Sequence, residues 1–340
     1  MTDRLFRLCA LLVLAASLSA VSAAAQPGRS VEIIATPVFM HTPAEESAAR
    51  RVGRLEFVGG LELSSADEAF GGVSGLEVSE DGARALAISD RGQWIALDLA
   101  LNDAGIPQDI ASARMAPILD PEGEAFEGAF RDAEAMLVED GSVVLSFEGS
   151  HRLHRYPVAQ PFVEPEALFA SKGAFLRLPL SLRRQPRNGG IEAMVALDGD
   201  RLLLFSEREM AEEGGLMAWI WPGRGEAQPL YFGPPEGFSP TDAARLPGGD
   251  ILVLLRRFSP LTGVAASLMR IDAAAVAPEQ PFSGEVLATL MPPLTLDNME
   301  GLAVRQGADG RIWLYLVSDD NFRQLQRTLL LIYALEDPAA

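Results

Sequence analysis

The chain has 340 residues and a formal net charge of −19, from 47 acidic and 28 basic side chains. Such an acidic surface repels nucleic acid and anionic membranes, and it attracts divalent cations. Cys9 is the only cysteine, which excludes an intrachain disulfide and a thiolate metal site.

The N-terminus has the three-part pattern of a secretory signal peptide. Arg4 and Arg7 precede an apolar run over residues 8–20, and small residues follow at 23–25. The run is shorter than the roughly 18 residues that a membrane-spanning helix needs. We therefore expect a Sec-type signal peptide over residues 1–25 and a periplasmic or secreted protein. A buried N-terminal helix is the alternative.

The rest of the chain divides into an N-terminal extension, residues 26–52, and a single domain, residues 53–336. In five segments of this domain a polar residue, acidic in four cases, precedes a small one. These segments begin at Ser74, Glu134, Glu192, Asp242 and Glu300, at spacings of 60, 58, 50 and 58 positions. The dipeptides that follow them are Asp81-Gly82, Asp140-Gly141, Asp198-Gly199, Gly248-Gly249 and Asp309-Gly310. Such dipeptides predict tight β-hairpins.

After each turn comes an apolar run without polar alternation, for instance residues 143–147 and 312–317. Continuous apolarity indicates a strand that is buried on both faces, and the blades of a propeller provide that environment. Two further strands can be read in most repeats. The sequence therefore predicts an all-β fold, a β-propeller with five readable blades.

The two ends of this domain complement each other. The last repeat ends with residues 328–333 and lacks a fourth strand, which residues 54–58 can supply. Pairing the two ends would close the ring and remove two exposed sheet edges. Residues 31–39 form a further strand-like segment, which leaves a sixth blade open.

Strand direction predicts that charged residues gather on one rim of the disc. The first two strands of each repeat are antiparallel, so the start of the first lies beside the end of the second. The starts carry Ser74, Glu134, Glu192, Asp242 and Glu300, and the ends carry Asp90, Arg91, Glu148, Glu207, Arg256, Arg257, Asp319, Asp320 and Asn321. Carboxylates crowded in this way cannot all ionise unless a cation binds. The alternative is that the acids cap strand ends or pair with the arginines.

We derive the candidate site residues from this arrangement. The candidate metal ligands are Glu134, Glu192, Asp242 and Glu300, and oxygen ligands favour Ca²⁺, with Mg²⁺ as the second choice. The candidate catalytic residues, which would orient water or protonate a leaving group, are Asp90, Glu148, Glu207 and Asp319. The candidate substrate-binding residues are Arg91, Arg256, Arg257 and Asn321, because arginine can bind phosphate oxygens in pairs.

Several other chemistries lack their motifs. Residues 72–76 miss the last glycine of a Gly-x-Ser-x-Gly nucleophile turn. No dinucleotide or phosphate-loop fingerprint occurs, so we expect no organic cofactor. His151 and His154 fall on an expected outer strand, where surface exposure suits them better than zinc binding.

The chain resembles the phytase-like family of exported bacterial propellers. The resemblance lies in SGLEVSEDGARALAISDRGQW at 74–94, NGGIEAMVALDGDRLLLFSE at 188–207, FSPTDAARLPGGDILVLLRRFS at 238–259, and residues 132–156 and 299–333. It covers nearly all of the predicted domain and implies ester or phosphoester hydrolysis, assisted by calcium as in β-propeller phytases. The calcium-binding motifs of those enzymes do not match this chain residue by residue, so no ligand set is carried over.

We therefore expect a monomeric hydrolase that cleaves phosphate esters of small molecules with the help of a metal. We expect no nucleic-acid partner and no membrane span. Two alternatives stay open: a non-catalytic periplasmic binding or scaffold propeller, and a lactonase-like or carboxylester hydrolase. Convergence of three or more carboxylate oxygens on one point favours an enzyme, whereas acids that are each paired with an arginine or a backbone amide favour a scaffold.

Overall fold

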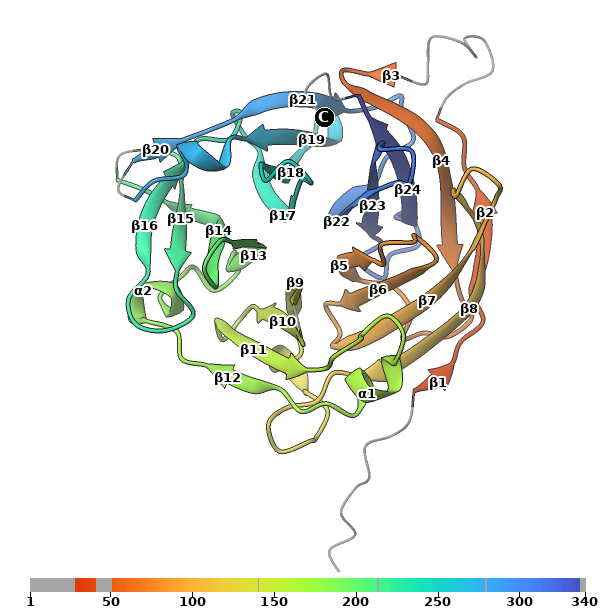
Figure 1. Cartoon of the computed structure of the whole chain (residues 1–340), viewed down its shortest axis with the longest axis horizontal. Coiled ribbons are helices and arrows are strands. Elements are labelled where there is room, and N and C mark those ends of the chain that lie inside the picture. The colour runs from red at the N-terminus through yellow and green to blue at the C-terminus, as the bar shows by residue number, and fades with distance from the viewer. Residues whose placement is uncertain (1–27, 41–50, 140, 213, 279, 337–340) are drawn as a thin grey trace, which may run out of the picture.

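The computed structural model describes residues 28–40, 51–139, 141–212, 214–278 and 280–336. The predicted signal peptide, residues 1–25, lies outside the described residues. Within them, five sheets surround a common axis (Figure 1), which confirms the predicted five-bladed β-propeller. None of the described helices is long and apolar enough to cross a membrane.

Each of the first four blades is an antiparallel sheet whose first strand lies nearest the axis (Figure 1). Blade 1 contains β5 (Val73–Val78), β6 (Arg84–Ser89), β7 (Gln93–Leu101) and β8 (Pro107–Pro117). Blade 2 contains β9 (Ala133–Glu139), β10 (Ser142–Phe147), β11 (Arg152–Pro157) and β12 (Ala174–Leu176). Blade 3 contains β13 (Ile191–Leu197), β14 (Arg201–Met210), β15 (Leu216–Trp221) and β16 (Gln228–Phe232). Blade 4 contains β17 (Ser239–Arg245), β18 (Ile251–Ser259), β19 (Gly263–Ile271) and β21 (Glu285–Leu290).

Blade 5 closes the ring with strands from both ends of the domain. Its C-terminal strands are β22 (Asn298–Gln306), β23 (Ile312–Asp319) and β24 (Thr328–Leu335), and its outer strand is β4 (Leu55–Ser64). The pairing of β24 with β4 is antiparallel and runs from Thr328 opposite Leu63 to Leu335 opposite Leu55. The predicted closure is therefore confirmed, and it pairs two strand edges that would otherwise be exposed.

The N-terminal extension adds strands to the outside of existing blades. β1 (Arg29–Ser30) pairs with β8, whereas β2 (Ile34–Pro37) and β3 (Arg51–Val52) pair with β4. Residues 31–39 therefore do not build a sixth blade. The remaining elements are β20 (Pro281–Phe282), which pairs with β16, and the short helices η1 (Gly128–Phe130), α1 (Pro165–Phe169), α2 (Leu180–Arg183) and η2 (Ala273–Ala275).

The apolar runs of the sequence fill the spaces between blades. All eight residues of β23 are buried, and so are all eight of β24. On one face of this sheet Trp313 and Tyr315 pack towards blade 1, and on the other Leu314 and Leu316 pack towards blade 4. Burial on both faces explains why these strands lack polar alternation.

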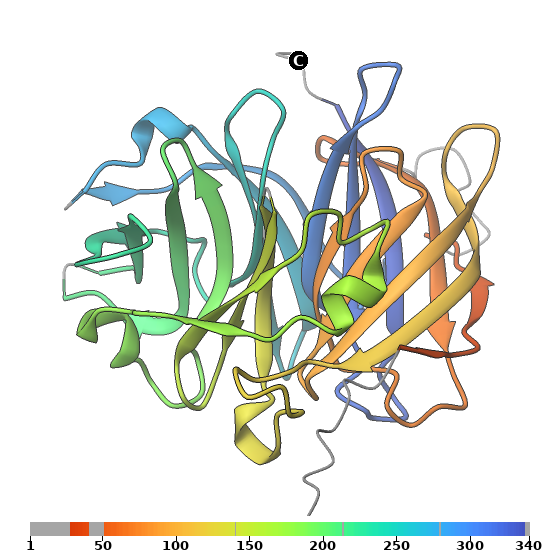
Figure 2. The same cartoon turned by 60° about the horizontal axis from the view of Figure 1, so that its bottom comes forward.

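The two faces of the disc differ in their loops. The predicted Asp-Gly turns lie at one face, where Gly82 and Gly310 have φ angles of 72° and 83°. The other face, called the mouth below, is where the inner strands begin and where the chain passes from one blade to the next. Figure 2 shows the yellow segment with η1 and the blue loop between β23 and β24 on this same side.

Candidate functional site

A β-bulge at the mouth turns one residue of each inner strand out of the ladder. In blade 3, Ile191 pairs with Ser206 and Ala193 pairs with Phe205, so Glu192 has no partner of its own. The inner pairs of the other four blades shift register at the equivalent place. The residues in those bulges are Ser74, Glu134 with Ala135, Thr241 and Glu300. Bulges redirect side chains in this way next to many active sites.

In blade 4 it is Thr241, and not Asp242, that occupies the bulge. The sequence-based alignment of Asp242 with Glu192 and Glu300 is therefore one residue out of register. Asp242 is buried and accepts hydrogen bonds from its neighbour, Ala243 N, at 2.8 Å and from Leu302 N of blade 5 at 2.7 Å. Burial raises the pKa of this carboxyl well above its usual range. The structure thus gives Asp242 a backbone-capping contact.

Hydroxyl groups join neighbouring blades directly beside the acids of the mouth. The hydrogen bonds run from Ser74 Oγ to Ala133 O at 2.6 Å, from Ser146 Oγ to Ile191 O at 2.8 Å and from Thr241 Oγ1 to Met299 O at 3.2 Å. Each accepting carbonyl belongs to the residue immediately before Glu134, Glu192 or Glu300. The bonds therefore fix the backbone that carries each of these carboxylates.

Three carboxylates of blade 2 converge at the mouth. Asp132 precedes β9, Glu134 lies on β9 and Glu148 follows β10, and one oxygen from each lies within 4.8 Å of the other two. We call these residues the acid triad. The sequence analysis found Glu134 and Glu148 but missed Asp132, which lies two residues before the start of the repeat. The alternation Asp-Ala-Glu in that segment was the available signal.

The acid triad is electrostatically crowded. Burial is the main cause that raises the pKa of Glu134 well above its usual range, and Glu192, Asp132 and Glu148 add to the effect. Burial also raises the pKa of Asp132 and of Glu148. Carboxyl oxygens this close can coexist only if a proton or a cation lies between them. A divalent cation would replace that proton and satisfy the same oxygens.

In the opposite part of the mouth one arginine, Arg256, contacts several acidic and amide side chains, and Arg208 Nε adds a second cation 2.7 Å from Glu207 Oε2. Arg256 Nη1 donates to Asn298 Oδ1 at 2.7 Å, and its guanidinium lies 3.3 Å from both Glu207 Oε1 and Glu300 Oε1. Asn298 Nδ2 donates in turn to Glu300 at 2.8 Å and to Asp319 at 3.4 Å. We call Arg256, Asn298, Glu207, Glu300 and Asp319 the Arg256 network. Sequence analysis identified four of them and missed Asn298.

Burial outweighs the arginine in setting the acidity of this network. The pKa of Glu300 rises to about 8 mainly because of burial, although Arg256 opposes the rise. Burial likewise raises the pKa of Asp319 to about 6, against a hydrogen bond from Asn321 N at 2.6 Å. Each carboxyl group of the network is therefore either paired with an arginine, hydrogen-bonded to an amide, or protonated more readily than in water.

Glu192 lies between the acid triad and the Arg256 network. Its side chain is only 8% exposed and makes no hydrogen bond or ion pair with any described residue. Burial raises its pKa well above the usual range, and Glu207, Glu148 and Glu300 raise it further. A buried carboxyl without a partner is costly, so its place beside the triad indicates a ligand-binding role.

Asp90 and Arg91 extend the acid triad towards blade 1. Asp90 Oδ1 is buried and has no hydrogen-bond partner among the described residues. Burial, then Asp319 and Asp132, raise the pKa of Asp90 to about 7. The Arg91 guanidinium lies 3.2 Å from the centre of the Phe322 ring, which orients it at the mouth.

Two further arginines surround these groups. Arg131 acts electrostatically on both Asp90 and Asp132, and its side chain has no ion pair within the described residues. The sequence analysis did not single it out. Arg257, which it did, stacks on Phe238 at 4.8 Å rather than pairing with an acid.

His154 contradicts the expectation of surface exposure, because it is fully buried. It packs against Phe126, Phe147 and Phe175, and burial lowers its pKa to about 4. His151 is half-buried, with Nε2 2.9 Å from Pro186 O. Neither histidine belongs to the cluster of described residues that could hold a metal.

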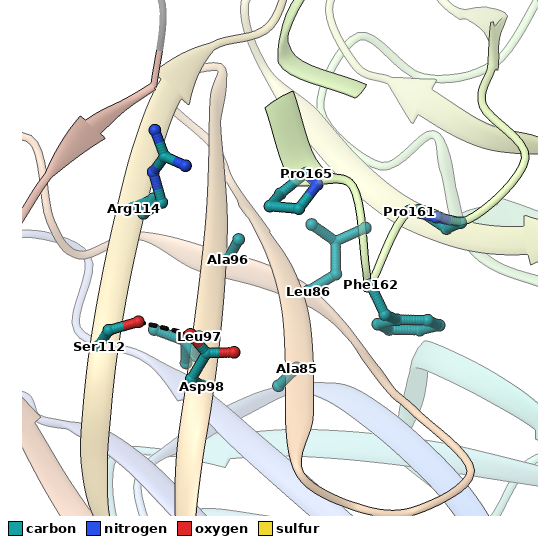
Figure 3. A pocket seen from close by; sticks show the side chains of 10 residues that line it. All are labelled: Ala85, Leu86, Ala96, Leu97, Asp98, Ser112, Arg114, Pro161, Phe162 and Pro165. Atoms are coloured by element: carbon teal, nitrogen blue, oxygen red, sulfur yellow. Dashed lines mark hydrogen bonds between the residues drawn. The ribbon is translucent and has the colours of Figure 1, made fainter. Parts of the chain in front are cut away.

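A small hollow between blades 1 and 2 does not belong to the site (Figure 3). It is lined by Leu86, Arg114, Phe162 and their neighbours, and Ser112 Oγ donates there to Asp98 at 2.5 Å. Its volume is about 30 Å³, which is the share of one water molecule in the liquid. It is too small for an organic substrate.

Comparisons with known proteins identify the family. No curated protein matches the chain. Among solved structures, the PQQ-bound aldose sugar dehydrogenase of Streptomyces coelicolor is 11% identical with a TM-score of 0.46, over 82% of this chain and 98% of that one. Myxococcus xanthus glutaminyl cyclase is 14% identical with a TM-score of 0.42, over 83% and 97%.

Residues 68–322 match the model of a family described as phytase-like, with esterase-like activity of phytase. The match spans β5 to the loop after β23 and includes the acid triad and the Arg256 network. The chain belongs to the phytase-like family.

Proposed function

We propose that this protein hydrolyses phosphate esters at the mouth, with a divalent cation held by the acid triad. The supporting observation is the convergence of oxygens from Asp132, Glu134 and Glu148 within 4.8 Å of one another. Ligand oxygens lie about 2.3–2.6 Å from Ca²⁺, so two oxygens on one ion are at most about 5 Å apart. The oxygens of the triad lie within that distance. Carboxylate oxygens are hard ligands, which bind Ca²⁺ in preference to softer metals.

Glu192 supplies the next oxygen beside the triad, because it is buried and makes no hydrogen bond or ion pair with any described residue. The cation would neutralise phosphate charge and act as a Lewis acid there. Glu300, the other sequence-predicted ligand of this ring, is held by Arg256 and Asn298 instead. Arg256 acts electrostatically on Glu192, so we assign Glu300 and the rest of the Arg256 network to holding Arg256 in place near Glu192.

Other residues at the mouth can donate a proton to the leaving group and bind the phosphate. Asp90, with its pKa of about 7, retains a proton near neutral pH and can donate it to a leaving alkoxide. Arg91 and Arg131 flank Asp90 and can bind phosphate oxygens through paired N–H groups. Glu148 is oriented by Gly189 N, which donates to its carboxylate.

A carboxylester is the second candidate substrate. Arg256 already forms ion pairs with Glu207 and Glu300, so fewer cations remain to bind a multiply charged phosphate. A singly charged or neutral carboxylester does not need them. The description of the matching family also names esterase-like activity.

Turnover by the mature protein tests both candidates. Protein stripped with chelator would be assayed with and without Ca²⁺ on 4-nitrophenyl phosphate, inositol hexakisphosphate and 4-nitrophenyl acetate. The variants are Glu134→Gln and, as a control on the face opposite the mouth, the exposed Glu226→Gln. We expect Ca²⁺ to restore phosphate release in the wild type and in Glu226→Gln but not in Glu134→Gln. Turnover of the acetate alone would assign a carboxylesterase, and no turnover would leave a binding or scaffold propeller.

A further inference from the structure

One segment next to the acid triad is positively charged, whereas the molecule as a whole is acidic. Residues 167–191 contain five cations and no acid, in a chain with 47 acidic side chains. The cations are Lys172, Arg177, Arg183, Arg184 and Arg187. Lys172 and Arg177 flank β12, Arg183 ends α2, and Arg184 and Arg187 lie in the loop that leads to β13 and therefore to the mouth.

The arginines of this segment lack partners. Arg177, Arg183, Arg184 and Arg187 are exposed, and none of them forms an ion pair with any residue that the structure describes. Elsewhere in blades 1 and 2, arginines such as Arg114 and Arg155 lie 2.7 and 2.9 Å from glutamates. Unpaired like charges repel one another, so the segment is electrostatically prepared for an anion.

A hollow of about 480 Å³ lies against this segment. Its lining consists of Ser150, His151, Arg152, Phe175, Leu176, Arg177, Leu178 and Arg183. Three guanidinium groups therefore border one space that has room for a phosphate or carboxylate group.

Arg152 is held rigidly at the edge of this hollow. Its guanidinium carbon lies 4.2 Å from the centre of the Phe147 ring and 4.9 Å from that of Phe126, and it donates to Ser150 O at 3.0 Å. Burial lowers its pKa to about 10, which leaves it charged at neutral pH. A fixed arginine loses little conformational entropy on binding an anion.

The hollow and the acid triad share neighbouring residues of the chain. Glu148 of the triad and Ser150, His151 and Arg152 of the hollow share the turn between β10 and β11. Gly189, at the end of the basic segment, donates its N–H to Glu148. Both ends of the basic segment's path to the mouth are therefore tied to Glu148, which places the hollow beside the triad along the chain.

We propose that this hollow is a second anion-binding site, which takes a phosphate or carboxylate group through Arg152, Arg177 and Arg183. The occupant is either a second anionic group of the substrate or free phosphate released by the reaction. The first source rests on the proposed function, whereas the binding site itself does not. The chain has a net charge of −19, which repels anions. The basic segment makes the electrostatic potential positive locally, so that an anionic ligand can bind there.

Titration with inorganic phosphate tests the site without any turnover. Calorimetry would use mature protein freed of metal by chelator, and the double variant Arg177→Gln/Arg183→Gln. The control, Arg201→Gln/Arg224→Gln, removes two exposed charges at the face opposite the mouth. We expect Kd to rise at least about tenfold in the first variant and less than about twofold in the control. Equal phosphate affinity in the wild type and Arg177→Gln/Arg183→Gln would overturn the proposal, once matching melting temperatures show that the variant is folded.

Kinetics then distinguish the two sources. Fructose 1,6-bisphosphate carries a second anionic group, and glycerol 2-phosphate does not. A KM raised about tenfold for the bisphosphate alone would assign the site to the substrate. Unchanged KM values with loss of inhibition by phosphate would assign it to free phosphate. Absence of turnover in the wild type would contradict the proposed function, while the titration above would still decide on the site.

Discussion

The backbone amide of Leu302 in blade 5 donates a hydrogen bond of 2.7 Å to Asp242 Oδ2 in blade 4. Glu77 of blade 1 makes the corresponding contact with Val138 N of blade 2, at 3.3 Å. The inner strands turn one edge towards the axis, where no strand can pair with it. These two carboxylates supply acceptors for amides at that edge, so some of the acids near the axis stabilise the ring rather than bind ligands.

Replacing Asp242 should therefore affect stability more than cation binding. Asp242→Ala leaves the Leu302 and Ala243 amides buried without acceptors, which should lower the free energy of unfolding by about 2 kcal/mol. Asp242→Asn keeps one acceptor and should cost less. Urea unfolding measures the loss, and Ca²⁺ affinity should not change in either variant. A clear fall in affinity with unchanged stability would make Asp242 a metal ligand instead.

Arg256 should be essential to the stability of its network. In Arg256→Met, Glu300 remains buried without its cation and Glu207 keeps only Arg208, so the free energy of unfolding should fall by about 3 kcal/mol. The double variant Arg256→Met/Glu300→Gln should recover at least about 1 kcal/mol, because a neutral amide can be buried without either the cation or the bound proton that Glu300 needs. The measurement is urea unfolding at pH 8. Equal stability of the single and double variants would show that Glu300 does not depend on Arg256.

His154 should make the fold sensitive to acid. Its pKa is about 4 in the folded protein against 6.5 for the free side chain, so the unfolded chain gains a proton first as the pH falls. The free energy of unfolding should therefore be highest above pH 6.5. It should fall by about 3 kcal/mol in total as the pH drops to 4, because the unfolded chain binds the proton more tightly. His154→Phe removes the titrating group from an aromatic environment. Unfolding free energies measured between pH 7.5 and 4.5 should decline less in this variant, and parallel curves would refute the assignment.

Cation binding should strengthen with rising pH. Burial and neighbouring acids raise the pKa of Glu134, so at lower pH a proton competes with the cation for the triad. Binding of Ca²⁺ should release protons, which calorimetry detects as a dependence of the heat on the ionisation enthalpy of the buffer. A binding heat that is identical in Pipes and Tris buffers would contradict this competition.

The architecture could be read from the sequence because its signals are local and repeated. Asp-Gly turns and continuous apolar runs recur in the repeats, and the missing strand of the last repeat matches the spare strand of residues 54–58. The burial of His154 could not be predicted in the same way. It depends on Phe126 and Phe175, which come from segments that cover β11 only in the folded chain.

The site was predictable in outline but not in register. Glu134, Glu192 and Glu300 were placed correctly at the mouth, because antiparallel pairing brings strand starts and strand ends together. Asp242 was aligned one residue away from its equivalent, Thr241, because a β-bulge leaves no mark in the sequence. Asp132 was missed because it lies outside the repeated strand.

Calorimetric titration of the chelator-treated mature protein with Ca²⁺ tests the central claim most directly. The wild type should bind one ion per chain in the acid triad, Glu134→Gln and Asp132→Asn should lose at least about tenfold in affinity, and Glu226→Gln should match the wild type. Equal affinity in all four proteins, or no binding in the wild type, would contradict a cation site formed by Asp132, Glu134 and Glu148.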